Sequence, residues 1–252
     1  MNIKSPTRND IPSLRALWKE AFSDTDSFLD SFFETAFSPE RALCIADGEG
    51  ISAAMYWFDC ECLGKRIAYI YAVATDKAQR GRGLCTLLMN EAHRRLLEQG
   101  YVGAILVPGE ARLFDFYGRL GYKVSSSVRE FSTAASGEPI ELRPVDAEEY
   151  AKIRRSLLPD GGVIQEKENL SFLFETNALY AGEGFLLAAW REKNFLFASE
   201  LLGDVSLAPH ILSSLGCYKG HFRTVGEEKP FAMYLPLSGD ADTPSYFGLA
   251  FD

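Results

Sequence analysis

The most constraining feature of this 252-residue chain is an apolar segment that runs directly into a loop rich in glycine and arginine. The segment Arg66–Thr75 (RIAYIYAVAT) is almost continuously apolar, which is typical of a strand buried on both faces of a sheet. Beyond the loop, Leu84–Glu98 carries apolar residues at helical spacing, and Gly100 follows where a left-handed cap is needed. A buried strand followed by a covering helix predicts an α/β chain.

The loop itself has the composition of an anion-binding site. Gly81 and Gly83 lack Cβ atoms, so a phosphate group can approach the backbone closely. The following helix adds unpaired N–H groups and the positive end of its dipole, while Arg80 and Arg82 add charge. Thr86, in the first turn, can donate a hydroxyl. The sequence matches neither a Walker loop nor a dinucleotide fingerprint, and a merely solvated connection is the alternative interpretation.

The rest of the first half alternates between the helical period and short apolar runs. The expected helices are 11–22, 26–37 and 110–120, and the expected strands are 41–46, 51–60, 101–107 and 122–131.

In this setting the loop resembles the pyrophosphate loop Arg/Gln-x-x-Gly-x-Gly/Ala of the GNAT superfamily of N-acetyltransferases. Arg80, Gly83 and Cys85 occupy its three fixed positions, and Cys85 departs from the usual Gly or Ala. The resemblance implies the GNAT acyl-CoA acyltransferase fold, a mixed α/β sheet, with acetyl-CoA as cosubstrate. It also implies that the strand backbone at Val73 and Thr75 pairs with the pantetheine arm. The implied cofactor-binding residues are Val73, Thr75, Arg80, Gly81, Arg82, Gly83, Cys85 and Thr86.

A second stretch, FYGRLGY at 116–122, is similar to the family's F-Y-x-x-x-G-F/Y motif. The resemblance implies that Tyr117 is the general acid, because acetyl transfer to an amine leaves a CoA thiolate that a nearby phenol can protonate. Direct attack of the amine on the thioester needs no covalent cysteine, and Cys85 belongs to the phosphate end of the site. The alternative is that Tyr117, with Phe114 and Phe116, only forms the apolar face of its helix.

The general base is left open by the sequence. Amine attack needs a neutral nucleophile, so a carboxylate or a water chain must accept a proton. The family's usual Asn before this helix is absent, and Glu110, Asp59 and Glu61 are the candidates near strand ends. Each of the three is equally explained as a capping or surface charge.

The second half looks like a degenerate copy of the first. The segment 132–139 (STAASGEP) has the composition of a linker, which predicts a catalytic domain at 1–135 and a GNAT-like domain at 136–252. The expected helices are 146–157, 166–177 and 209–215, and the expected strands are 141–144, 184–191, 194–202, 222–225, 230–237 and 246–251. The acidic Gly203-Asp204 replaces an anion loop, so this half is not expected to bind CoA.

Two such units in one chain resemble the enhanced-intracellular-survival type of acetyltransferases, without the sterol-carrier-like domain into which those proteins continue. Their members modify aminoglycosides or other amines, and can use a C-terminal carboxylate as the base. By that resemblance Asp252, after an apolar strand-like segment, is a second catalytic candidate. An edge strand that merely completes a sheet is the alternative.

Composition and charge narrow the classes of partner. The net charge of −9 argues against a nucleic-acid binder, and neither a membrane span nor a secretory signal is evident. The five cysteines and three histidines lack metal or disulfide spacing, so we expect free thiols in the cytoplasm and no metal. Residues 1–135 carry a net −1 and residues 136–252 a net −8. An acidic wall would concentrate a cationic acceptor, such as a polyamine, an aminoglycoside-like amine or a basic peptide, although the charge is also explained by solubility.

Together these patterns predict a cytoplasmic N-acetyltransferase that transfers an acetyl group from acetyl-CoA to a primary amine by direct attack. A non-catalytic acyl-CoA-binding regulatory module is the alternative function.

Overall fold

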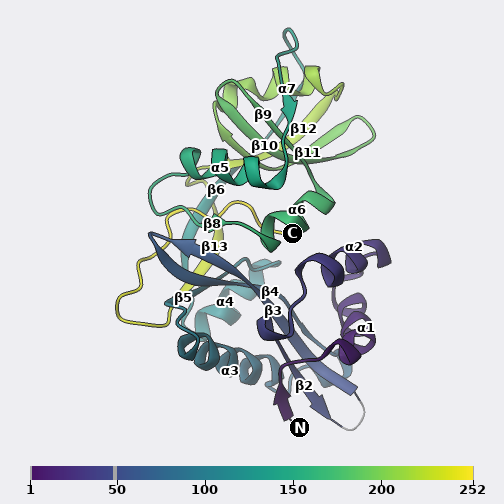
Figure 1. Ribbon diagram of the computed structural model, residues 1–252, viewed down its shortest axis with the longest axis vertical. Coiled ribbons are helices and arrows are strands. Elements are labelled where there is room, and N and C mark those ends of the chain that lie inside the picture. Colours follow the sequence, from purple (N-terminus) through teal and green to yellow (C-terminus); the bar gives the residue numbers. More distant parts are fainter. Residues whose placement is uncertain (1, 48–49, 252) are drawn as a thin grey trace.

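The computed structural model describes residues 2–47 and 50–251, which form an elongated molecule with the two halves of the chain at opposite ends (Figure 1). The first half contains the strands β1 (Asn2–Lys4), β2 (Ala42–Asp47), β3 (Gly50–Cys62), β4 (Lys65–Thr75), β5 (Gly103–Leu106) and β6 (Lys123–Ala134). Its helices are α1 (Ile11–Phe22), α2 (Asp26–Ser31), which continues as a π-helical turn at Phe32–Ala36, α3 (Leu84–Glu98) and α4 (Ala111–Arg119).

The second half repeats this alternation on a smaller scale. Its strands are β7 (Arg143–Pro144), β8 (Ile164–Gln165), β9 (Ala178–Gly182), β10 (Phe185–Glu192), β11 (Phe195–Gly203), β12 (Lys219–Val225) and β13 (Lys229–Pro236). Its helices are α5 (Ala147–Leu157), α6 (Glu168–Thr176) and α7 (Ala208–Ser214).

A single mixed sheet runs through both halves, in the order β1-β2-β3-β4-β5-β13-β6-β12-β11-β10-β9-β7, with β8 paired to β3. Strand β13, from the end of the chain, lies between β5 and β6 and is antiparallel to both. Strand β6, which belongs to the first half, pairs in turn with β12 over the whole length of β12. Each half therefore completes the sheet of the other.

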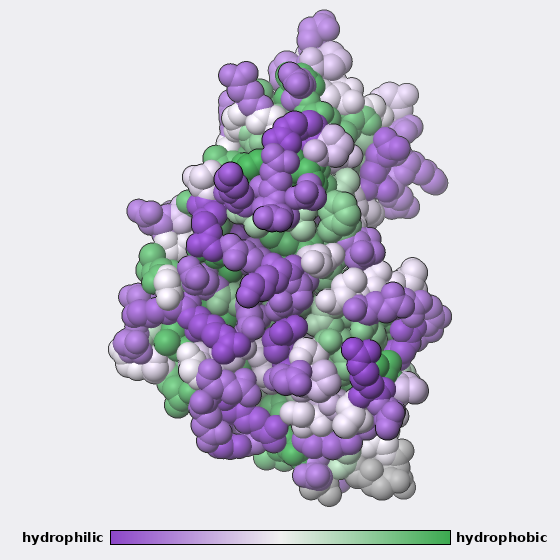
Figure 2. Space-filling model, viewed as in Figure 1, coloured by the Kyte–Doolittle hydropathy of each residue, from purple (hydrophilic) through white to green (hydrophobic). Residues whose placement is uncertain are grey.

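Three buried clusters hold the layers together. One lies between α3, α4 and the strands that the first half contributes to the sheet, and a second lies under α1, α2, α5, α6 and residues 246–251. The third packs α7 against the strands of the second half. The outer surface is mostly hydrophilic on the face drawn in Figure 2, where apolar residues occur in small groups. Among the described residues, no helix is both long enough and apolar enough to cross a membrane.

The two halves share a local unit that supports the repeat predicted from the sequence. In the first half, β4 is followed by a 3₁₀ turn (Lys77–Gln79), α3 and the parallel strand β5. In the second half, β11 is followed by a 3₁₀ turn (Val205–Leu207), α7 and the parallel strand β12. Only the first copy has residues 80–83 between turn and helix. The prediction of two related units, of which the second is degenerate, is confirmed by this repeat, and the division at residue 135 stays a prediction.

Most elements expected in the first half are present within a few residues, but three expectations are wrong. Residues 246–251 are not a strand, because their backbone groups bond mainly to side chains and contribute only one isolated bridge, from Tyr246 to Gly162. The segment 132–139 is not wholly a linker, since residues up to Ala134 belong to β6. The strands β1, β8 and β9 were not expected; the first two are only two or three residues long.

Candidate acyl-CoA and acceptor site

A bulge bends β4 before its end. The pairs Ala54–Ala74 and Tyr56–Tyr71 leave Ala72 and Val73 together opposite one residue of β3. Ala72 has φ +47°, a conformation that is uncommon for a residue with a Cβ atom. Bulges of this kind redirect a strand and are frequent beside functional sites.

The pairing of β4 with β5 ends before the bulge. Their parallel pairing runs from Ile67–Gly103 to Tyr69–Ile105 and stops there, although β4 continues to Thr75. Within the described chain no strand pairs with this edge of β4 at Val73 or Thr75. Backbone N–H and C=O groups that face such a gap can hydrogen-bond an extended ligand in the way that a neighbouring strand would.

The loop after β4 has open space beside its two glycines. Asp76 Oδ1 accepts a hydrogen bond from Ala78 N at 2.8 Å, which fixes the 3₁₀ turn before the glycines. Gly81 and Gly83 have φ of +78° and +76°, and a Cβ atom at either position would meet nothing within 4 Å. The backbone conformation therefore requires glycine at both positions, and the space beside them is open.

The N-terminus of α3 adds further donors. Leu87 N bonds to Gly83 O at 3.0 Å, whereas the amides of residues 84–86 have no acceptor in the described chain. Arg80 Nε donates to Thr75 O at 3.1 Å, and Arg82 donates to Gln79 Oε1. Neither guanidinium group forms an ion pair with a described residue, so both keep charge available beside the open amides.

Cys85 and Thr86 are half-buried in the first turn of α3. Burial raises the pKa of the Cys85 thiol to about 11, so it stays protonated at neutral pH. A protonated thiol is a poor nucleophile. The geometry fits a structural role for Cys85 and a reaction without a covalent cysteine intermediate.

Tyr117 lies on α4 in the same buried cluster as Cys85. Its side chain is packed against Phe116 and Tyr122, at ring distances of 5.2 and 5.9 Å, and only 7% of the residue is exposed. Its hydroxyl has no hydrogen-bond partner among the described residues, yet it is not among the buried unpaired atoms. Burial, with the nearby Cys85 sulfur, raises the pKa of Tyr117, which keeps the phenol as a proton donor.

Comparison with known proteins agrees with this geometry. Residues 2–125 match the family described as "Acetyltransferase (GNAT) domain". The N-terminal half of the chain belongs to the GNAT family of acetyltransferases. This half is therefore an N-acetyltransferase domain. No curated protein matches the chain.

Solved structures extend the similarity of fold to nearly the whole chain. A GCN5-related N-acetyltransferase from Kribbella flavida has a TM-score of 0.69 at 18% identity, covering 92% of this chain and 70% of its own. One from Anabaena variabilis has 0.71 at 14% identity, covering 94% and 73%. Eis1 from Mycobacterium abscessus has 0.66 at 13% identity, covering 94% and 74%. The fold of nearly the whole chain, including both units, is thus shared with these structures.

The three carboxylates suggested as bases of the GNAT unit are all engaged elsewhere. Glu110, exposed at the start of α4, pairs with Arg112 at 2.7 Å. Asp59 accepts from Arg66 at 2.8 Å, and Glu61 lies 3.7 Å from Arg155.

Asp59 and Glu61 also lie at the wrong end of β4. Asp59 is opposite Ala68 in β4, which is roughly 16 Å along the strand from Val73. Both carboxylates therefore lie opposite the part of β4 that pairs with β5, and not opposite Val73.

The sequence reasoning did not identify an aromatic cluster on the other face of the GNAT sheet, next to the gap. Its members are Phe28, Phe58, Tyr69, Tyr71, Phe172 and Phe251. Phe251 contacts Phe58, Tyr69, Tyr71 and Phe172 at ring distances of 5.1, 5.8, 5.6 and 5.2 Å. Tyr69 is the residue where pairing with β5 stops, so this end of the chain reaches the gap, and it lies between the two halves in Figure 1. Asp252, the other predicted catalytic residue, lies outside the described residues.

In the second unit, the position that corresponds to the phosphate loop does not offer open amides to an anion. Asp204 Oδ1 accepts from the backbone and the hydroxyl of Ser206, at 2.9 and 2.7 Å. Strands β11 and β12 stay paired, across a bulge, from Phe195–Lys219 to Leu201–Thr224. An acidic cap and paired strands leave no equivalent place for an anion or an extended ligand.

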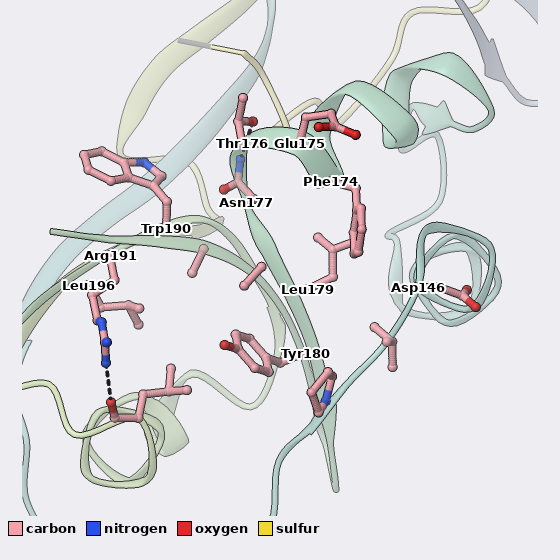
Figure 3. Close-up of a pocket in the computed structure, with 15 residues that line it drawn as sticks. Asp146, Phe174, Glu175, Thr176, Asn177, Leu179, Tyr180, Trp190, Arg191 and Leu196 are labelled. Carbon is pink, nitrogen blue, oxygen red and sulfur yellow. Dashed lines mark hydrogen bonds between the residues drawn. The ribbon is translucent and has the colours of Figure 1, made fainter. Parts of the chain in front are cut away.

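A cavity of about 820 Å³ lies in this second unit, between the end of α6 and strands β9 and β10 (Figure 3). Phe174, Tyr180 and Trp190 line it, with Arg191 bonded to Leu215 O at its edge. None of the predicted site residues borders it.

Proposed function

We propose that the chain is an acetyl-CoA-dependent N-acetyltransferase that transfers the acetyl group directly to a primary amine of a small or cationic acceptor. The observation that carries this proposal is the end of β4, which β5 leaves unpaired and which leads into a helix start with open amides and two arginines that form no ion pair with a described residue. Tyr117 lies in the cluster beside that helix start.

Acetyl-CoA would be held by backbone more than by side chains. The open amides of residues 84–86, with Arg80 and Arg82, suit a pyrophosphate group, and the bare Cβ positions of Gly81 and Gly83 leave room for it. The edge of β4 at Val73 and Thr75, with which no described strand pairs, suits the two amides of the pantetheine arm. Cys85 and Thr86 would border this part of the site.

In the transfer step, the neutral amine nitrogen attacks the thioester carbon, a C–N bond forms and the C–S bond breaks. The departing thiolate takes the proton of the Tyr117 hydroxyl, and the proton of the attacking amine passes to a base. We propose a carboxylate of Asp252 as that base, because Phe251, directly before it, rests on Tyr69 and Tyr71 at the gap.

The acceptor class follows from the aromatic cluster and the charge. Aromatic faces attract ammonium groups, so Tyr71, Phe28 and Phe251 suit the approach of a cationic amine. The net −8 of the second half favours the same class, such as a polyamine or an aminoglycoside-like amine.

All five cysteines are free thiols, which supports a reducing cytoplasmic setting.

Isothermal titration of acetyl-CoA against the wild type and an Arg80→Ala/Arg82→Ala variant tests the binding half of the proposal. Thiol release with spermidine, kanamycin and a lysine-rich peptide tests the transfer half. We expect binding that the variant loses, and amine-dependent thiol release. Binding without release would instead favour the acyl-CoA-binding regulatory module, and absence of binding would contradict the assigned site.

A further inference from the structure

A fully buried ion pair lies in the core of the second unit. Arg154 on α5 binds Glu200 on β11 through two hydrogen bonds of 2.6 and 3.0 Å, with side-chain exposures of 1% and 0%. Two tyrosine hydroxyls complete the group, from Tyr150 on α5 at 3.3 Å and from Tyr246 at 3.0 Å. Tyr246 differs from the other members because it belongs to the C-terminal segment.

That segment is held at almost every residue from Tyr246 to Phe251, which we call the tail. Its contacts are Val163 N to Tyr246 O at 2.8 Å, Phe247 N to Ser126 Oγ at 2.8 Å, Arg223 Nη1 to Gly248 O at 3.4 Å, Gln165 Nε2 to Leu249 O at 2.9 Å and Phe251 N to Tyr69 Oη at 3.3 Å. The tail therefore begins at the buried ion pair of the second unit and ends at the gap in the first.

The ion pair needs an explanation other than stability. A buried pair often contributes no more stability than well-packed apolar residues of similar volume would. What the pair supplies is a fixed carboxylate: Arg154 holds both oxygens of Glu200, and one oxygen then has a defined direction for the Tyr246 hydroxyl. An apolar residue at position 200 could not orient a hydroxyl.

Gly248, in the tail, leaves the space that the Tyr246 hydroxyl occupies in this orientation. A Cβ atom at Gly248 would lie 2.0 Å from Tyr246 Oη, and its φ is outside the left-handed region. Gly248 is therefore needed for the close passage of the Tyr246 hydroxyl and not for its own backbone conformation.

We propose that Arg154, Glu200 and Tyr246 form a positioning device, in which the second unit orients the tail so that Phe251 forms one wall of the acceptor site beside Tyr69 and Tyr71. This proposal rests on the proposed acetyltransferase function. It gives the degenerate unit a role in the reaction of the first unit, although it has no anion loop of its own.

Two conservative variants, each of which removes one tyrosine hydroxyl that donates to Glu200, test the proposal. Tyr246→Phe removes the hydroxyl that comes from the tail, and Tyr150→Phe removes the hydroxyl that comes from α5. Gly248→Ala displaces the Tyr246 hydroxyl without removing it. Each variant is compared with the wild type by hydrogen–deuterium exchange of peptides covering 246–251, by acetyl-CoA titration, and by thiol-release kinetics with the most active amine of the spermidine, kanamycin and peptide panel.

We expect faster exchange of the tail and an acceptor KM raised about tenfold in Tyr246→Phe and Gly248→Ala, with acetyl-CoA binding unchanged. Tyr150→Phe should alter neither the exchange of the tail nor the acceptor KM. Equal exchange of the tail in Tyr246→Phe, Tyr150→Phe and wild type would overturn the positioning role. A loosened tail with an unchanged acceptor KM would overturn its link to the acceptor site. Absence of thiol release from the wild type would count against the proposed function, and the exchange comparison would still decide the positioning role.

Discussion

Phe251 donates its backbone N–H to the hydroxyl of Tyr69 at 3.3 Å, although 182 residues separate the two in the chain. Tyr69 is the last residue of β4 that pairs with β5, so the end of the second unit meets the first where its sheet opens. Strand β13 makes a similar connection on the other side of the gap, since it pairs with β5 itself. Both edges of the opening therefore depend on residues from the second half of the chain.

The role of Tyr117 predicts a selective kinetic defect. Tyr117→Phe should lower kcat about a hundredfold or more, because the thiolate would leave without its proton donor. Acetyl-CoA affinity and melting temperature should change little, since the hydroxyl has no partner to lose. Tyr122→Phe is the matched control: its hydroxyl bonds to His93 Nε2 at 2.8 Å, so this variant should lose about 1–2 kcal/mol of stability and keep kcat. Equal kcat values for the two variants would exclude Tyr117 as the acid.

The phosphate loop predicts a binding defect that can be separated from strain. Asn tolerates positive φ better than other residues with a Cβ atom, so Gly83→Asn should fold at a cost of about 1 kcal/mol or less while filling the space beside the amides. Its dissociation constant for acetyl-CoA should rise at least about tenfold through loss of charge-assisted contacts. Gly100→Asn, at the other end of α3, has the same open Cβ position at φ +83° and should bind acetyl-CoA like the wild type. Titration calorimetry of both variants makes the comparison.

The position of β13 beside β5 predicts that the protein needs a glycine at position 103 of β5 for its stability. A Cβ atom at Gly103 would lie 1.9 Å from Tyr234 Oη on β13, so Gly103→Ala should displace the buried Tyr234 ring from its place over β5. We expect a loss of about 2–3 kcal/mol, equivalent to roughly 5–10 °C in melting temperature. Gly109→Ala is the control, because a Cβ atom there meets nothing within 4 Å. A melting temperature for Gly103→Ala equal to that of Gly109→Ala would argue against a close β5–β13 pair.

The local parts of the site could be predicted from the sequence. The loop glycines, the two arginines and the following helix are contiguous, and positive φ at Gly81 and Gly83 is a property that the residue type itself indicates. The place of Tyr117 on a helix was predicted in the same way, because its motif is also contiguous, and its role as the acid stays a prediction. The expectation that the second unit lacks an anion loop depended only on Gly203 and Asp204, and Asp204 does cap its own turn.

The non-local parts could not be predicted. Residues 246–251 have the apolar composition of a strand, but their backbone partners are side chains from Ser126, Gln165, Arg223 and Tyr69, which no short pattern indicates. Residues 132–134 are small and polar like a linker, yet they complete β6 because β12 pairs with them. Strand pairing between distant segments, such as β13 with β5, is decided by packing of the whole sheet.

His93 predicts a specific dependence of stability on pH. Burial lowers the pKa of this imidazole to about 4 in the folded state, against about 6.5 in an unfolded chain. The unfolded state therefore binds the extra proton between these values, and the free energy of unfolding falls as the pH drops from 6.5 to 4. Removal of this group in His93→Gln should make the fall shallower by on the order of 2 kcal/mol over that window, and should leave the difference from wild type constant above pH 7. Urea denaturation at pH 4.5, 5.5, 6.5 and 7.5 measures the difference, and parallel pH profiles for the two proteins would show that His93 titrates normally.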